Sequence, residues 1–265
     1  MKPFGILALV LAAVVAAGAA TAKDEDAMKQ LVPTGTLRVA LVFAPSKSAF
    51  FVVKDQKGRP NGVTADISAA LAQSLGVPVE YVLFPNSGLA TDATASGAVD
   101  VSFMPVDAER KKRVDFGPNY VLIESTYMAT AASGAQTVAD VDRAGMRVIG
   151  IANTTTIRAA ARTLKNTTIS PVISVDDAVA MLRDGKADAF ALSRDSLPVY
   201  VKQIPGSRIV DGGFQATGIA IAVPKERPAA LATVTQFMEE AKKSGIVRRA
   251  LDDAGFNDEP VAPAM

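Results

Sequence analysis

One arginine stands where the pattern of a buried strand ends and that of a helix begins. The stretch Asp100–Phe116 is DVSFMPVDAERKKRVDF; its apolar start predicts a short strand, and Pro105 interrupts the ladder. Asp107 has the side chain of a helix N-cap, so Arg110 is expected near the carboxyl end of the strand, where open α/β sheets bind ligands. A guanidinium grips a carboxylate through two parallel hydrogen bonds. The pattern predicts carboxylate binding; a plain surface charge is the alternative that position alone leaves open.

A second anion-binding pattern follows the apolar run Ile149–Ala152. The next four residues are an asparagine and three threonines, among them Asn153, Thr155 and Thr156, and a helical pattern begins there. The free N–H groups at a helix start, with the helix dipole behind them, favour a carboxylate, and threonine hydroxyls add donors. Simple capping of the helix is the competing interpretation. If both patterns bind, this helix start and Arg110 could share one carboxylate.

The composition removes much of the usual chemistry of sites. The 265 residues include no histidine and no cysteine, so imidazole bases, thiol nucleophiles and the common transition-metal ligands are missing. We therefore expect neither a metal nor a cofactor. With 28 basic and 27 acidic side chains, the formal net charge is +1. This balance gives no sign of a nucleic-acid surface.

The first residues have the pattern of a secretory signal. Lys2 precedes the apolar run Phe4–Ala20, and a small-x-small cleavage site ends at Ala22. The run is short for a spanning helix and consists largely of alanine and glycine, which disfavours a membrane anchor. We expect residues 1–22 to be a signal peptide and the rest to be a soluble, exported protein.

Strands that alternate with helices must position these candidate residues. Apolar and β-branched runs predict strands at 37–43, 50–53, 77–84, 100–104, 120–129, 147–152, 168–174, 187–193 and 217–223. The helical stretches between them predict an α/β fold with mostly parallel sheets. Two long strands, 120–129 and 217–223, are expected to cross between two lobes. The predicted lobes are 35–125 plus 215–258, and 126–214, with a two-segment hinge that lets a cleft close.

The motifs together resemble those of a known family. DVSFMPVDAERKKRVDFGPNY, the GTLRV start at Gly35–Val39 and the closing segment 218–251 are similar to the bacterial periplasmic solute-binding proteins of the polar amino-acid type, family 3. The resemblance covers nearly all of the chain after the signal. It implies a periplasmic-binding-protein type II-like fold, with the ligand cleft between two α/β lobes. It also implies a periplasmic, monomeric receptor of an ABC importer that captures an amino acid or related organic acid by cleft closure, with a membrane permease as partner.

The resemblance assigns ligand-binding roles to individual residues. Arg110 falls on the family's arginine, and Thr155 and Thr156 fall on its ligand-binding Ser/Thr pair. Asn153, at the start of the same motif, and Met104, at the end of the first motif's strand, are further candidates. Arg110 on one lobe and the helix start at Thr155 and Thr156 on the other would hold the carboxylate of the ligand.

Other positions depart from the family pattern. Ser193 stands where the family usually has the aspartate that holds the ligand ammonium, and Asp195 follows two residues later. Pro105 replaces a common Ser or Thr, which removes a hydroxyl and an N–H. Asn86 stands where an aromatic ring often stacks on the ligand. The residues expected to bind the ligand carboxylate are therefore present, whereas the site expected to bind the ligand ammonium is weakened.

Two hypotheses about the ligand follow. The ligand is a small carboxylate without an α-amino group, because a buried ammonium without a partner costs several kcal/mol. Alternatively, Asp195, Asn86 and water hold an amino group in a variant geometry. Arg194 is available for a second acidic group of the ligand. Phe43 and Phe50 are candidate ring walls of the cleft, with plain core packing as their alternative role.

The principal alternative to a binding protein is an enzyme on the same fold, because a few members of this fold resemble dehydratases acting on cyclic carboxylates. Such a reaction needs a general acid in the cleft. Glu80, Glu109, Glu124 and Asp195 are the candidates, and nothing in the sequence marks one of them as catalytic. A sensor module is a third possibility, but no signalling segment follows. We therefore expect a binding protein without catalytic residues.

Overall fold

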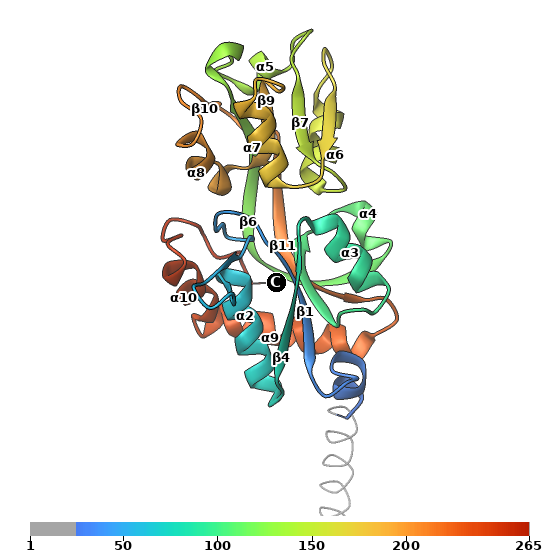
Figure 1. Cartoon of the computed structure of the whole chain (residues 1–265). Helices are drawn as coiled ribbons and strands as arrows, with labels where there is room; N and C mark the ends of the chain where they lie inside the picture. The colour runs from blue at the N-terminus through green and yellow to red at the C-terminus, as the bar shows by residue number, and fades with distance from the viewer. Residues whose placement is uncertain (1–24, 265) are drawn as a thin grey trace, which may run out of the picture.

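Two long strands connect two bodies of α/β structure (Figure 1). The computed structural model describes residues 25–264, so the predicted signal peptide, residues 1–22, lies outside the described residues. The connecting strands are β6, Val114–Ala129, and β11, Gln215–Pro224. Each contains one of the two crossing segments that the sequence predicts.

The first body, drawn below the second in Figure 1, is built on three parallel strands. They are β1 (Leu37–Val42), β4 (Val79–Phe84) and β5 (Val101–Pro105), with β1 in the middle. β11 continues this sheet by pairing antiparallel with β5. The helices of the first body are α2 (Val63–Leu75), α3 (Ser87–Ala95), α4 (Ala108–Lys111), α9 (Pro228–Lys243) and α10 (Ile246–Asp253).

The second body repeats the plan with shorter strands. Its parallel strands are β7 (Val148–Ile151), β8 (Ile169–Val172) and β9 (Ala189–Ser193), and the two-residue β10 (Arg208–Ile209) pairs with β6. Its helices are α5 (Val138–Val141), α6 (Thr155–Thr163), α7 (Val175–Arg183) and α8 (Leu197–Val201), with 3-10 turns η1 (Ala131–Ser133) and η2 (Arg194–Ser196). The alternation of parallel strands and helices confirms the predicted α/β class.

Strand β6 belongs to both bodies. Its first part, Val114–Ser125, pairs with β11, and its last part, Ser125–Ala129, pairs with β9. A single sheet of nine strands therefore runs through the whole molecule. The chain between the bodies is extended and hydrogen-bonded rather than a loose linker. The lobe boundaries 35–125 with 215–258, and 126–214, stay a prediction.

The strand predicted at residues 50–53 is largely absent from the structure. Strand β2 covers only Val53–Lys54 and forms a small hairpin with β3, Pro60–Asn61. The reason is local: the hydroxyl of Ser48 accepts hydrogen bonds from the backbone N–H groups of Phe50 and Phe51, at 3.0 and 2.8 Å. A side chain that satisfies these donors replaces a neighbouring strand.

The same arginine–aspartate arrangement begins the sheet of each body. In the first body, the backbone N–H and Nε of Arg38 donate to Oδ2 of Asp100 at 2.9 and 3.0 Å, and Nη2 donates to Oδ1 at 2.6 Å. In the second body, Arg147 donates to Asp188 from the same three atoms, at 2.9, 2.9 and 2.7 Å. The Asp100 side chain is fully buried, whereas that of Asp188 is 16% exposed. Each pair fixes two neighbouring parallel strands at their amino ends.

The difference in burial gives a prediction about stability. Asp100→Ala is expected to lower the free energy of unfolding by about 3–5 kcal/mol, because it leaves part of a buried ion pair without its partner. Asp188→Ala, the matched change in the second body, is expected to cost about 1–2 kcal/mol, because water reaches that pair. Urea unfolding of residues 23–265 measures both. Equal losses would show that burial does not set the strength of these pairs.

Candidate functional site

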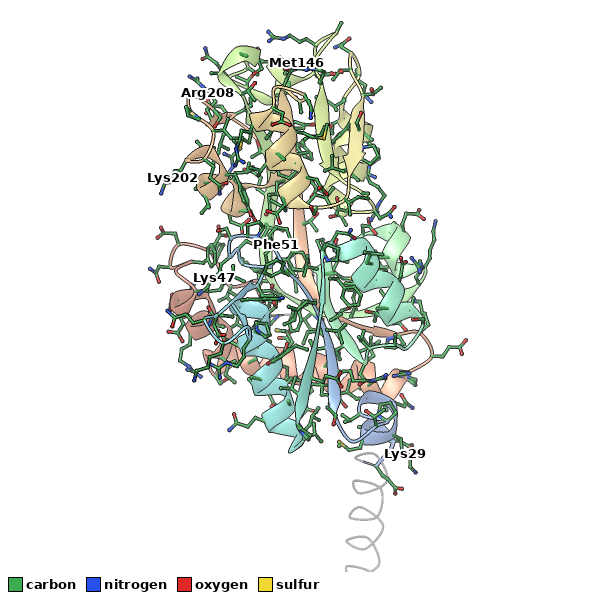
Figure 2. All side chains as sticks on the ribbon, viewed as in Figure 1. Lys29, Lys47, Phe51, Met146, Lys202 and Arg208 are labelled. Atoms are coloured by element: carbon green, nitrogen blue, oxygen red, sulfur yellow. The ribbon has the colours of Figure 1, made fainter. Side chains whose placement is uncertain are left out.

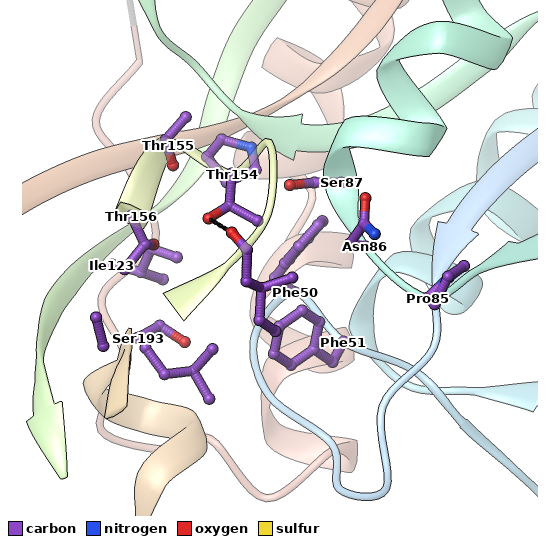
Figure 3. Close-up of a pocket in the computed structure, with 14 residues that line it drawn as sticks. Phe50, Phe51, Pro85, Asn86, Ser87, Ile123, Thr154, Thr155, Thr156 and Ser193 are labelled. Carbon is purple, nitrogen blue, oxygen red and sulfur yellow. Dashed lines mark hydrogen bonds between the residues drawn. The ribbon is translucent and has the colours of Figure 1, made fainter. Parts of the chain in front are cut away.

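A small cavity lies where the two bodies meet (Figure 3). Its volume is about 30 Å³, which is enough for a water molecule. The residues that line it from the first body are Phe50, Phe51, Pro85, Asn86, Ser87 and Pro105. The others, from β6 and the second body, are Ile123, Ile151, Thr154, Thr155, Thr156, Ala191, Leu192 and Ser193. Figure 2 shows Phe51 between the two bodies.

Arg110 lies directly behind two of the lining residues. Its guanidinium donates from Nη1 to the carbonyl of Pro105 at 2.9 Å and from Nη2 to the hydroxyl of Ser87 at 2.6 Å. Nη2 also donates across the cleft to the carbonyl of Asn153 at 3.3 Å. The residue is only 3% exposed, and burial, followed by the charge of Arg158, lowers the pKa of Arg110 to about 9. All three acceptors are neutral, so among the described residues no carboxylate is hydrogen-bonded to this buried cation.

The local sequence explains how Arg110 reaches this position. β5 ends at Pro105, and Asp107 caps α4 by accepting the backbone N–H of Arg110 at 2.8 Å. This confirms the predicted order of strand, cap and helix. The turn brings the arginine back under the end of its own strand, against the first turn of α3.

On the second body, Thr154 caps α6 and leaves the next two threonines available. The Thr154 hydroxyl accepts from the N–H of Ile157 at 3.2 Å and donates to the carbonyl of Ile151 at 2.8 Å. The hydroxyl of Thr156 lies 3.4 Å from that of Ser125, and that of Thr155 has no hydrogen-bond partner among the described residues. Capping therefore does not occupy the two predicted ligand residues.

Asn153 and Asn86 place backbone and amide groups at the edge of the cavity. Asn153 has φ 59°, in the left-handed region that asparagine tolerates, and this turn points its carbonyl at Arg110. Asn86 caps α3 by accepting from the N–H of Leu89 at 3.0 Å. Its amide also donates to the carbonyl of Ile173 in the second body, at 3.2 Å. Both asparagines therefore join the bodies beside the cavity.

Ser193 lines the cavity, but Asp195 does not. The Ser193 and Ser196 hydroxyls are 2.7 Å apart. Beyond β9, the turn η2 directs Asp195 into a separate groove, where its Oδ2 accepts the backbone N–H of Ala49 at 2.8 Å. Its Oδ1 is buried without a partner in bonding geometry, and burial raises the pKa of Asp195. Asp195 thus holds the first body instead of facing the cavity.

Three further predicted residues lie outside the cavity. Met104 is fully buried in β5, where its sulfur accepts the hydroxyl of Thr91 at 3.3 Å. The ring of Phe43 lies 5.6 Å from the ammonium of Lys54. Arg194 forms an ion pair with Glu124. Of the two candidate ring walls, the structure brings only Phe50 to the cavity.

Some lining residues were not predicted from the sequence. The most important is Ser87, because its hydroxyl bonds to Arg110 and faces the cavity. It directly follows Asn86, the cap of α3, so a polar residue in the first turn of a helix at a strand's carboxyl end was the available signal. Phe51 and Ile123 add apolar surface, and in sequence they look like ordinary core residues.

The lining residues carry no acid, base or metal ligand. All are apolar, hydroxyl or amide side chains. Within residues 25–264, no group of three His, Cys, Asp or Glu side chains is placed to hold a metal ion. The same residues include no helix whose length and apolar character would allow it to cross a membrane.

Two α/β bodies, linked by two strands and closed over a cavity, define the periplasmic binding proteins of type II. Residues 41–253 match the bacterial extracellular solute-binding proteins, family 3, and the chain belongs to this family. The resemblance inferred from the motifs is thereby confirmed.

Individual relatives are distant but span most of the chain. A probable histidine-binding protein of Campylobacter jejuni is 25% identical over 233 residues, 85% of this chain and 87% of that protein. An ancestral amino acid-binding protein, a precursor of cyclohexadienyl dehydratase, superposes with a TM-score of 0.74 at 26% identity, covering 85% of this chain and 98% of its own. A mutant of ArgBP from T. maritima has the same TM-score at 25% identity, covering 86% and 98%.

The raised pKa of Asp195 predicts a pH dependence of stability. An aspartate whose folded pKa lies above its unfolded value of 3.8 stabilises the fold while protonated, and this contribution is lost as the pH rises through the folded pKa. Asp195→Asn stays uncharged, so we expect it to exceed the wild type in unfolding free energy by about 1 kcal/mol near pH 7. The gain should vanish as the pH falls toward 3.8.

Thermal unfolding at a series of pH values tests this expectation. Asp211→Asn is the matched control, because Asp211 is an exposed aspartate of the second body. A gain for Asp195→Asn that is the same at every pH, or no larger than that of the control, would contradict the prediction.

Proposed function

We propose that this chain is the periplasmic receptor of an ABC importer and captures a small carboxylate-bearing solute by closing its two bodies over it. The bodies serve as the lobes 35–125 with 215–258, and 126–214. Family membership supports the receptor role. The observation that carries the ligand class is the buried guanidinium of Arg110, whose three hydrogen-bond acceptors are all neutral.

A buried cation without a hydrogen-bonded anion is costly, and a ligand carboxylate removes that cost. Arg110 is hydrogen-bonded directly to two residues that line the cavity, Ser87 and Pro105. Its third acceptor, the carbonyl of Asn153, belongs to the second body and leaves when the bodies separate. A guanidinium has five N–H donors, so opening exposes free donors to an entering carboxylate. The N–H groups and hydroxyls at Thr155 and Thr156 then meet the same carboxylate from the other side as the cleft closes.

The cavity lining favours a carboxylate without an α-amino group. None of the lining residues is charged, and Asp195, the nearest candidate for an ammonium, is engaged with Ala49. An ammonium would meet only hydroxyl and carbonyl oxygens, which offset its burial poorly. The competing proposal, an amino-acid ligand, is supported by the similarity to a probable histidine-binding protein and to an ancestral amino acid-binding protein.

The enzyme alternative is less well supported by the site. One structural neighbour is a precursor of a dehydratase, so the fold is compatible with that reaction class. However, the four carboxyl groups predicted as general-acid candidates lie elsewhere: Glu80 and Glu109 are exposed, Glu124 pairs with Arg194, and Asp195 bonds to Ala49. We therefore retain the binding function.

A thermal-shift screen tests the proposal. Residues 23–265 are screened against L-amino acids and their deaminated analogues, such as L-alanine with propanoate and L-leucine with 4-methylpentanoate. A ligand of the folded state at a hundred times its Kd adds about 2.7 kcal/mol of stability and raises the midpoint. We expect the carboxylates to raise it. Shifts with amino acids alone would favour the competing proposal, and no shift with either series would contradict the carboxylate function.

Arg110→Met supplies the matching mutational test. We expect it to weaken binding of any ligand found by about 100-fold or more, because the ligand carboxylate loses its charged partner. The unliganded variant should be as stable as the wild type or more stable, because an apolar side chain replaces a buried cation. Arg113→Met, which removes an exposed arginine paired with Asp92, is the control. Unchanged affinity in Arg110→Met would contradict the assigned role.

A further inference from the structure

We propose that the ion pair between Asp107 and Arg158 is a clasp that sets how long the cleft stays closed. Asp107 belongs to the first body, as the cap of α4, and Arg158 belongs to α6 of the second body. Nε of Arg158 donates to Oδ2 of Asp107 at 2.9 Å, and Nη2 donates to the same oxygen. The side chains of Arg158 and Asp107 are 27% and 16% exposed, so the pair is partly shielded from water.

The clasp connects the two halves of the binding site. Oδ1 of Asp107 holds the backbone N–H of Arg110, while Oδ2 holds Arg158. Arg158 is one turn into the helix that begins at Thr155, so its bond to Asp107 draws the start of that helix toward Arg110. Neither member of the pair lines the cavity, and both therefore act on the ligand only through the position of the bodies.

The two bodies pack closely on the same rim as the clasp. Gly88 of α3 lies against Asn153, and a Cβ on Gly88 would be 2.5 Å from the Asn153 Cβ. The hydrogen bond from Arg110 to Asn153 crosses at the same place. Opening the cleft must therefore break the ion pair and expose both charges.

The electrostatics around Arg110 make the clasp necessary on this rim. Closure brings Arg158 close enough to lower the pKa of Arg110, which means that two positive charges face each other there. The negative charge of Asp107 offsets this repulsion. Its carboxylate accepts a hydrogen bond from the side chain of Arg158 and attracts the guanidinium of Arg110. Without the carboxylate, the two arginines repel each other and the closed arrangement loses its main attraction on this side.

The magnitude of the effect follows from the exposure of the pair. Loss of the clasp is expected to raise the open-to-closed ratio by about threefold to tenfold, between the value of an exposed ion pair and that of a charged hydrogen bond. Closure is weakened rather than abolished, because Asp195 still bonds to Ala49 and Asn86 still bonds to Ile173. The faster release of ligand that follows from a more open cleft rests on the proposed function.

The experiment measures opening in the protein without added ligand. Because the chain has no cysteine, two introduced cysteines can be labelled uniquely. We choose Gln56→Cys in the first body and Ala161→Cys in the second, both exposed and uncharged positions, and read the distance between fluorophores by single-molecule energy transfer. In this background we expect Arg158→Gln and Asp107→Asn each to raise the open fraction, Asp107→Asn more because it leaves Arg158 facing Arg110, with no rise in the double variant above Asp107→Asn. Asparagine keeps the capping oxygen at position 107.

Two further variants calibrate the result. Arg113→Gln removes an arginine whose partner, Asp92, lies in the same body, and it should leave the distances unchanged. Gly88→Ala obstructs closure directly and should raise the open fraction most. The effect of Arg158→Gln should shrink from low to high salt, because ion pairs are screened.

The outcomes separate this inference from the receptor function. If Arg158→Gln resembles Arg113→Gln, or if the effects of Arg158→Gln and Asp107→Asn simply add, the clasp is overturned. If Gly88→Ala also leaves the distances unchanged, the closed arrangement itself is wrong. Failure to find any ligand leaves the distance measurement intact and counts only against the proposed function. Where a ligand is found, its dissociation rate should rise about threefold to tenfold in Arg158→Gln, with an unchanged rate contradicting the clasp.

Discussion

The buried charge of Arg110 is the interaction on which the site depends. A guanidinium this well enclosed needs every available acceptor, and the fold supplies them from three directions: its own strand end, the first turn of α3, and the backbone of the second body. Only two of these acceptors belong to the same body as Arg110. The free energy of the buried guanidinium therefore depends on the position of the second body. An anion that enters the cleft changes the same free energy.

The hydrogen bonds between the bodies are few and spread over both rims. Asp195 and Asn86 each donate or accept a single hydrogen bond across the cleft, to Ala49 and Ile173. Bonds of this kind contribute only about 0.5–1.5 kcal/mol each in water. Such contacts can hold a closed form without locking it, which suits a protein that must release what it holds. The apolar surface of Phe50, Phe51 and their neighbours adds a driving force that does not depend on direction.

The parts of the site that depend on local sequence were predictable. The end of β5, the Asp107 cap and the helix start at Thr155 each follow from a few consecutive residues, and the structure contains all three. The contact of Ser87 with Arg110 depends instead on which strands are neighbours, and those residues are 23 positions apart. Asp195 was misleading for a similar reason, since the short turn η2 directs its side chain to another groove. Pairing order and turn direction are set by the whole sheet, which no single stretch specifies.

The order of the strands along the chain has a consequence for how the protein is made. β5 precedes β6, the strand that leads into the second body, and its free side is covered only by β11, more than a hundred residues later along the chain. The second body is nearly continuous in sequence, so it can assemble early. During synthesis, the first body keeps an open sheet edge, where β5 lies, until β11 emerges, and its last two helices follow later still. A growing chain with an unpaired strand of apolar residues is a target for misassociation. The shared strand design thus delays completion of the half that carries Arg110.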